Sequence, residues 1–189
     1  MRVGGVQADV SIERSRRPVA AQRIARLARE LLEASTLCAI ATVTTQGRAH
    51  ISTAYFAWTP ALEIAWLSEP RAQHSRNIRA NDSVAVAVHD STQTWGQSDR
   101  GIQLFGRARG VERSAVGSFE ALYATRFPEY GGLDQGTYRF YVLSPQRLKL
   151  FDEQELGAGV FITARVSRGG PRWERTDIYR SDVISRTRR

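Results

Sequence analysis

Residues 37–67 are divided into short apolar stretches by turn residues, and this segmentation limits the chain to a small set of folds. One stretch is apolar apart from its threonines, whereas the next alternates apolar and polar side chains with a period of two. Gly47 and Pro60 lie in the two intervening turns. The three stretches are 38–44, 50–58 and 62–67. Such segments predict consecutive antiparallel strands joined as a meander.

The rest of the chain adds further strands and three helices. Apolar side chains at three- and four-residue spacing predict an amphipathic helix over 18–34, which Pro18 opens. Shorter helices are expected at 72–79 and 114–126, the second capped by Ser114. Further strands are expected at 84–88, 102–112, 138–144, 147–151 and 160–166. The sequence thus predicts a mainly β (α+β) protein, with six to eight antiparallel strands in a barrel and peripheral helices.

The composition is that of one soluble domain. The chain has 189 residues, of which 42% are hydrophobic, and this is enough to bury a core. Cys38 is the single cysteine, so it forms no intramolecular disulfide and no cysteine metal cluster; we expect a buried thiol. No stretch of about 20 apolar residues exists, and residues 1–15 lack the apolar core of a signal peptide. We therefore expect a cytoplasmic protein without a membrane partner.

The formal charge of +8 is concentrated at the two ends of the chain. Residues 1–17 carry a net +2 and residues 168–189 a net +4, which leaves +2 for residues 18–167. The ends are also rich in glycine and arginine and poor in large apolar side chains. We expect flexible basic tails at 1–17 and 168–189, flanking one domain over 18–167. Solvated tails are favoured over a nucleic-acid partner, although non-specific binding through these arginines is an alternative.

Common catalytic signatures are absent from the sequence. The chain has one lysine, Lys149, and no phosphate-loop motif, no H-E-x-x-H pattern and no G-x-S-x-G motif. Three histidines without a cysteine cluster do not predict a metal site. An enzyme built from these residues would need an organic cofactor for the difficult chemical step.

The segment 66–78 carries the clearest binding signal. A strand ends at Ser68, a proline turn follows, and a helix then begins. The free amides at the start of a helix, together with its dipole, favour an anion. Arg71, His74 and Arg76 add hydrogen-bond donors within a few residues. This arrangement suits a phosphate or another dianion, although a solvated helix start with a proline turn gives the same pattern.

The order of these segments resembles the FMN-binding split barrel of the pyridoxamine 5'-phosphate oxidase-like superfamily. The resemblance covers residues 35–152, and no single segment is specific by itself. The matching segments are the strands 38–44, 50–58 and 62–67, the stretch Ser68…Gln73-His74-x-x-Asn77-Ile78, the strand 101–108 and the segment 143–148. The resemblance implies a split β-barrel and a homodimer with two flavin sites at its interface.

The resemblance also implies roles for particular residues. The phosphate of FMN would lie at the second strand and at the strand-to-helix loop, and the partner subunit would contribute residues that precede or begin the long fifth strand. The expected cofactor-binding residues of the first group are Ser52, Thr53, Leu67, Ser68, Arg71, Gln73 and His74, and those of the second group are Trp95, Arg100 and Gln103. The implied activity is an FMN-dependent oxidoreductase that exchanges a hydride or electrons with a small organic substrate. No catalytic residue is assigned.

This chain departs from the family pattern at two places. The vitamin oxidases of the family carry an Arg-Lys pair where this chain has Gln73-His74. An amide and a titratable imidazole should hold a phosphate less firmly at neutral pH, unless Arg71 or Arg76 compensates. Those oxidases also have a C-terminal segment whose arginine and histidine grip pyridoxal phosphate, and residues 173–189 do not reproduce it, although Trp173 and Arg180 are distantly similar. We therefore do not expect pyridoxamine phosphate as the substrate.

Two other functions fit the same barrel. Relatives of this kind also use the deazaflavin F420, whose acidic tail would be favoured by Arg48 and by the arginines of the 18–34 helix. Other relatives store or sense flavin or haem without catalysis. The sequence leaves these alternatives open.

Overall fold

The strands form one antiparallel sheet that closes on itself. The computed structural model describes residues 10–131 and 137–181, and nine strands lie within these ranges. They are β1 (Val10–Ser15), β2 (Leu37–Val43), β3 (Ala49–Trp58), β4 (Ile64–Ser68), β5 (Ser83–His89), β6 (Arg100–Gly110), β7 (Arg139–Asp152), β8 (Val160–Ser167) and β9 (Gly170–Ser181). The sheet order is β1-β9-β8-β7-β4-β3-β2-β5-β6, and an additional β6–β7 pairing closes β2 to β7 into a six-stranded barrel.

The long strand β7 accounts for the split character of this barrel. One edge of β7 pairs along β6, while its other edge pairs first with β4 over 139–143 and then with β8 over 147–151. The sequence predicted two strands here, at 138–144 and 147–151, whereas the structure has one. A register shift between Phe105 and Gly106 of β6 accommodates one extra residue of β7, Gln146.

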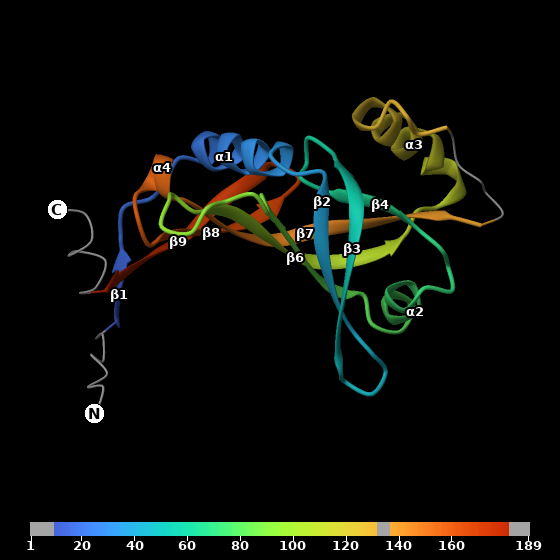
Figure 1. The fold of residues 1–189 in the computed structure, drawn as a ribbon, viewed down its shortest axis with the longest axis horizontal. Coiled ribbons are helices and arrows are strands. Elements are labelled where there is room, and N and C mark those ends of the chain that lie inside the picture. Colours follow the sequence, from blue (N-terminus) through green and yellow to red (C-terminus); the bar gives the residue numbers. More distant parts are fainter. Residues whose placement is uncertain (1–9, 132–136, 182–189) are drawn as a thin grey trace.

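The helices flank the barrel. They are α1 (Ala21–Glu33), α2 (Gln73–Ala80), α3 (Val116–Arg126) and the short α4 (Glu153–Leu156). In Figure 1, α2 and α3 lie on opposite sides of one end of the molecule, and α1 lies along the other end with α4, β8 and β9. Among the helices that the structure describes, none is long and apolar enough to cross a membrane.

Helix α1 closes the main core. Its buried residues recur at three- and four-residue spacing, as predicted, and pack against the barrel; they are Ile24, Leu27, Ala28, Leu31 and Leu32. The helix begins at Ala21, three residues after Pro18. Cys38 is buried in the same core, as expected, and this burial raises the pKa of its thiol to about 12.

The cap expected at Ser114 was wrong. Ser114 lies inside a 3-10 turn (Arg113–Ala115), and α3 begins after Ala115 without a side-chain capping bond. Aromatic side chains instead fix α3 to the barrel: the Tyr123 ring lies 5.6 Å from that of Phe140 in β7, and the Phe127 ring, directly after the helix, lies 5.6 Å from that of Tyr55 in β3.

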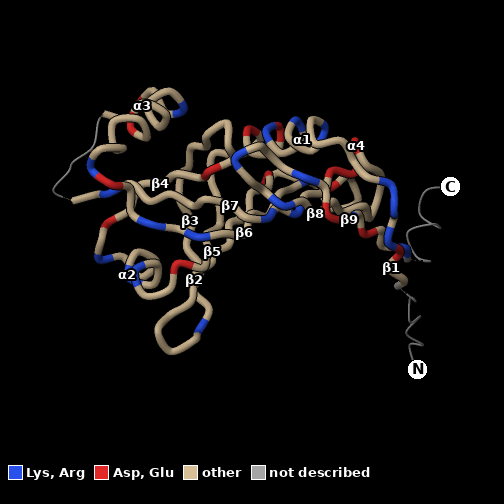
Figure 2. The backbone as a smooth tube through the Cα atoms, turned by 180° about the vertical axis from the view of Figure 1, so that it is seen from behind, with Lys and Arg blue, Asp and Glu red and all other residues tan. Residues whose placement is uncertain are grey.

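The described parts of the two expected tails form strands. Residues 10–15 pair with β9 over their whole length, and β9 pairs with β8 on its other edge. The expectation of unstructured tails was therefore wrong for 10–15 and 170–181, while 1–9 and 182–189 lie outside the described residues. The physical reason is ion pairing across the strands, in which Asp177 of β9 contacts Arg14 of β1 and Arg180 of β9 contacts Glu13 of β1. Basic and acidic residues are intermixed around β1, β8 and β9 (Figure 2).

Candidate functional site

A buried polar cluster lies between helix α2 and the strands beneath it. The α2 face that packs on β2 and β3 carries three polar side chains and one apolar one: His74, Ser75, Asn77 and Ile78. Polar residues meet them from β2, β3 and β4. We call this set the α2 polar cluster; it comprises Thr42, His50, Ser52, Ser68, Gln73, His74, Ser75 and Asn77.

Hydrogen bonds link the cluster from helix to strands. His74 Nδ1 lies 3.1 Å from the Ser52 hydroxyl, and the Asn77 amide donates to Thr42 Oγ1 at 2.9 Å. At the helix start, the Ser75 hydroxyl donates to the Ser68 hydroxyl at 3.2 Å. The structure thus brings together Ser52, Ser68 and His74, which the sequence had placed at one site from distant segments.

Two imidazole nitrogens of the cluster lack a hydrogen-bond partner within the described parts of the chain. They are His50 Nδ1 and His74 Nε2, and both atoms are buried. His74 as a residue is only 9% exposed. Burial lowers the pKa of its imidazole, and the nearby His50 lowers it further. Because a buried polar atom without a partner is costly, these nitrogens indicate a site for a ligand acceptor or a water.

The backbone at the start of α2 adds donors to the same place. The helix follows Ala72, which makes no side-chain capping bond, and the amide of Arg76 donates to the Ala72 carbonyl. The amides of residues 73–75 belong to the first turn, so they have no carbonyl acceptor within the helix. Together with the helix dipole, they favour negative charge beside His74.

The neighbouring arginines hold the turn that leads into α2. The Arg76 guanidinium donates to the Arg71 carbonyl at 2.6 Å and also bonds the Gln73 side chain. Arg79 donates to the Pro70 carbonyl at 2.8 Å. The Arg71 side chain is exposed. A ligand could therefore bind it without breaking the hydrogen bonds that Arg76 and Arg79 make in this turn.

Thr53 and Leu67 do not join the α2 polar cluster. Successive side chains of a strand point to opposite faces, so Thr53 lies on the other side of β3 from Ser52. There it lines an open groove of about 440 Å³ between β2, β3 and β5. Leu67 packs with the apolar residues beneath α3. Sequence proximity had grouped these residues with their neighbours, whereas the strand pleat separates them.

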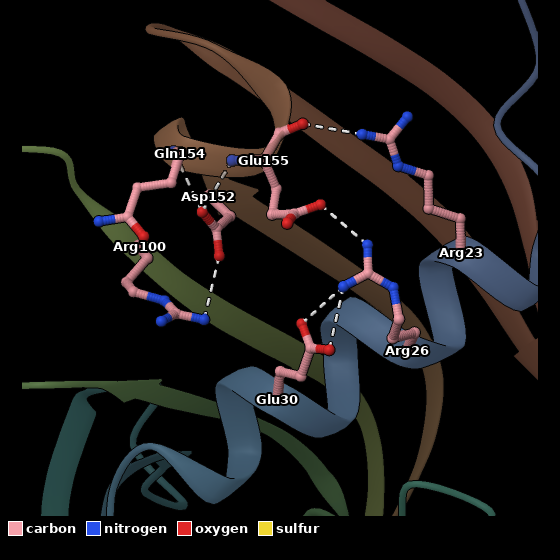
Figure 3. Close-up of polar contacts among 7 residues, drawn as sticks. All are labelled: Arg23, Arg26, Glu30, Arg100, Asp152, Gln154 and Glu155. Atoms are coloured by element: carbon pink, nitrogen blue, oxygen red, sulfur yellow. Dashed lines mark hydrogen bonds and ion pairs between the residues drawn. The ribbon is translucent and has the colours of Figure 1, made fainter.

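Arg100 lies in a different network, beside α1 and α4 (Figure 3). Its guanidinium pairs with Asp152 at 3.1 Å, and Asp152 is 1% exposed. The other oxygen of Asp152 accepts from the first-turn amides of α4. Within one subunit, therefore, the structure gives Arg100 a buried structural partner and does not place it at the α2 polar cluster.

The other two residues expected from a partner subunit are exposed. Trp95 is 97% exposed in the loop before β6, and Gln103 lies on the exposed face of β6. Their contribution to a cofactor site stays a prediction that requires a second copy of the chain.

Sequence reasoning missed Thr42 and Ser75 and did not select His50 for the cofactor site. A sequence feature could have pointed to each of them. Thr42 is polar within an otherwise apolar strand, and Ser75 is polar on the buried face of a short helix. His50 precedes Ser52 by two residues, so the two share one face of β3.

The closed six-stranded barrel, with α2 at the end of β4, defines a split-barrel protein. Residues 24–152 match the family model described as pyridoxamine 5'-phosphate oxidase. The chain belongs to this family. None of the curated proteins matches the sequence.

Solved structures share the fold. One is a protein of unknown function from Agrobacterium tumefaciens, with a TM-score of 0.60 and 21% identity, covering 68% of this chain and 56% of that one. A heme binding protein from Mycobacterium smegmatis has a TM-score of 0.59 and 19% identity, with coverages of 78% and 58%. The heme storage protein HutZ from Vibrio cholerae has a TM-score of 0.54 and 23% identity, and the match covers 66% of this chain and 88% of HutZ. The present chain spans little more than half the length of the first two proteins.

Proposed function

We propose that this protein is an FMN-dependent oxidoreductase that acts on a small organic substrate. The observation that carries the proposal is the buried, unpartnered Nε2 of His74 beside the free amides of α2. A phosphate oxygen would satisfy that nitrogen and those amides together. Family membership supports a flavin as the bearer of this phosphate.

The residues present fit a phosphate. The α2 polar cluster contains hydroxyls, two amides and two imidazoles but no carboxylate, so an anion meets no negative charge within it. Ser52, Ser68 and His74 would hold the phosphate, and Arg71 would approach from the exposed side of the turn. Bound FMN would supply hydride or single-electron transfer. The chain's own residues bind and orient it, and no side chain is assigned as an acid or base.

The proposal includes a homodimer. Large apolar side chains are exposed on the outer face of the barrel sheet: Leu37 (46%), Ile51 (69%), Tyr55 (57%) and Phe105 (39%). Contact with a second copy would remove this surface from water. It would also bring a second subunit's Trp95 and Gln103 toward the groove beside Thr53.

The absorbance spectrum of the purified protein, which reveals bound flavin, is the first test of the proposal. Fluorescence titration of the ligand-free protein with FMN, riboflavin and F420 then gives the affinity for each. Ser52→Ala should weaken FMN binding about 10-fold, because one hydrogen bond to a charged group is lost, and should leave riboflavin binding unchanged. A colourless protein that takes up neither FMN nor F420 would contradict the proposal. Tighter binding of F420 than of FMN would assign the same barrel to a deazaflavin-dependent reductase.

A second candidate is haem binding without catalysis. Two structures of similar fold are described as a heme binding and a heme storage protein, and a free imidazole nitrogen such as His74 Nε2 is a common iron ligand. A Soret band in place of flavin absorbance, lost in His74→Gln, would favour this function.

A further inference from the structure

His50 of β3 and His74 of α2 are both neighbours of Ser52, where α2 packs on β3. His50 lies two residues from Ser52 on the same strand, and His74 contacts that serine through Nδ1. Each imidazole has a buried ring nitrogen without a partner among the described residues. The two rings are close enough for His50 to act electrostatically on His74.

No permanent charge belongs to this pair. The strands contribute Thr42 and Ser68 beside it, both neutral, and α2 contributes Ser75 and Asn77. Of the charged side chains on the surrounding elements, Arg76 and Arg79 bond turn carbonyls, and Arg107 of β6 pairs with Asp82 at 2.6 Å. Arg48, in the turn before β3, is exposed to solvent. Exposed Arg71 and Glu69 lie at the rim of the turn. Both ionisable side chains of the α2 polar cluster are therefore imidazoles.

We propose that the His50–His74 pair takes up a proton when the cofactor's phosphate enters, so that a phosphorylated flavin binds together with a proton. This inference rests on the proposed function. In the ligand-free protein, burial and then the nearby His50 lower the pKa of His74, which favours its neutral form. A bound dianion favours the protonated form of His74. The Nε2–H of this imidazolium donates to a phosphate oxygen, while its Nδ1–H donates to Ser52. The proton comes from solvent.

The sign of the pH dependence follows from linkage. Burial holds the pKa of His74 below its usual value without ligand, and a phosphate raises it. Between these two pKa values, each bound phosphate carries one extra proton, so affinity falls as pH rises. For one linked proton the dissociation constant should increase up to about 10-fold per pH unit. Riboflavin, which lacks the phosphate, should show no such slope.

The experiment is calorimetric titration of the full chain with FMN and with riboflavin, in buffers of different ionisation enthalpy, at several pH values around neutrality. We expect net proton uptake with FMN and none with riboflavin. The FMN phosphate also gains charge as pH rises, with a second pKa of about 6, and this opposes the expected trend. At pH values well above 6 the FMN phosphate is already a dianion before it binds, so proton uptake measured there reports on the histidines alone. His74→Lys, which carries a permanent charge, should bind FMN without proton uptake.

The outcomes separate the two hypotheses. Equal proton uptake for FMN and riboflavin would overturn the proton-coupled pair while leaving the flavin function in place. If neither flavin binds, the proposed function fails, and the pair is then tested with inorganic phosphate through the imidazole C–H resonances of the unmodified protein. Phosphate should raise the pKa of a histidine at 50 or 74; unchanged titration curves would overturn the inference. Because this measurement uses the unmodified protein, it tests the inference even if the His74→Lys variant does not fold.

Discussion

At Gly106 the two closing strands of the barrel lie too close together to admit a side chain. A Cβ atom there would lie 2.2 Å from the Ser144 carbonyl oxygen and 2.8 Å from Pro145 Cα. Both atoms belong to the backbone, so no side-chain rotation relieves the clash. The glycine therefore permits the register shift that joins β6 to the bulged part of β7.

Gly106→Ala should destabilise the protein by at least about 2 kcal/mol, because β6 or β7 must move. Gly117→Ala is the matched control. Gly117 lies in α3 with no atom within 4 Å of an added Cβ, so alanine should stabilise by about 0.5–1 kcal/mol. Urea denaturation of both variants measures the difference. A Gly106→Ala midpoint equal to wild type would show that the strands are not held at this distance.

Asp152 is the second residue on which local structure depends. It is buried, pairs with Arg100 and accepts two amides of α4 (Figure 3). Asp152→Ala leaves these groups without a partner and should cost about 3–5 kcal/mol. Asp82→Ala removes an exposed pair with Arg107 and should cost less than about 1 kcal/mol. If chemical denaturation shows equal losses of stability for Asp152→Ala and Asp82→Ala, the Asp152 pair is not buried as described.

At the scale of elements, β9 decides whether the C-terminal segment is a strand or a tail. It pairs with β8 and β1, and Trp173 packs on the main core while donating to Thr176 at 2.9 Å. Ending the chain at Ser167 should expose the edge of β8 and apolar surface of α1, and so yield insoluble or unfolded protein. Light scattering and thermal unfolding measure this.

A charge control accompanies the truncation. Arg172→Gln removes a positive charge from β9 without removing the strand, and it should leave the thermal midpoint nearly unchanged because Arg172 is exposed. If the truncated chain keeps the wild-type midpoint and solubility, the segment contributes no strand to the fold.

The strands of the barrel were predictable because each carries a local signal. Strands 38–44, 50–58 and 84–88 showed apolar runs or alternation, and the structure has β2, β3 and β5 there. The strands β1 and β9 carry no such signal. These two strands pair with each other although they lie more than 150 residues apart in the sequence. Their polar side chains are compatible with strand pairing because they form cross-strand ion pairs such as Arg180 with Glu13.

At the scale of the whole molecule, surface charge and apolar surface point to different partners. Arg14 of β1 and Arg175 and Arg180 of β9 contact acidic neighbours. Arg147 and Arg165 likewise contact Glu174. This pairing weakens the argument for nucleic-acid binding through basic tails. The exposed apolar face of the barrel instead supports the proposed contact between two copies.

Ile51→Glu should convert the proposed homodimer into a monomer, because a charge placed in an apolar interface has no partner. The control is Ile12→Glu, which changes an equally apolar and similarly exposed side chain on the edge strand β1. Size-exclusion chromatography with light scattering gives the mass of each variant. A wild-type protein that is monomeric at every concentration would reject the dimer.

The amino-acid sequence alone determined the meander, the helix–strand order and the polar turn before α2, because these depend on periodicity and turn residues within a few positions. Only the tertiary structure decided that Ser52 faces α2 while Thr53 faces away, that Arg100 pairs with Asp152, and that the chain ends add strands. The reason is physical: pleat direction relative to the core, burial of an ion pair and long-range strand pairing arise from contacts between segments far apart in the chain.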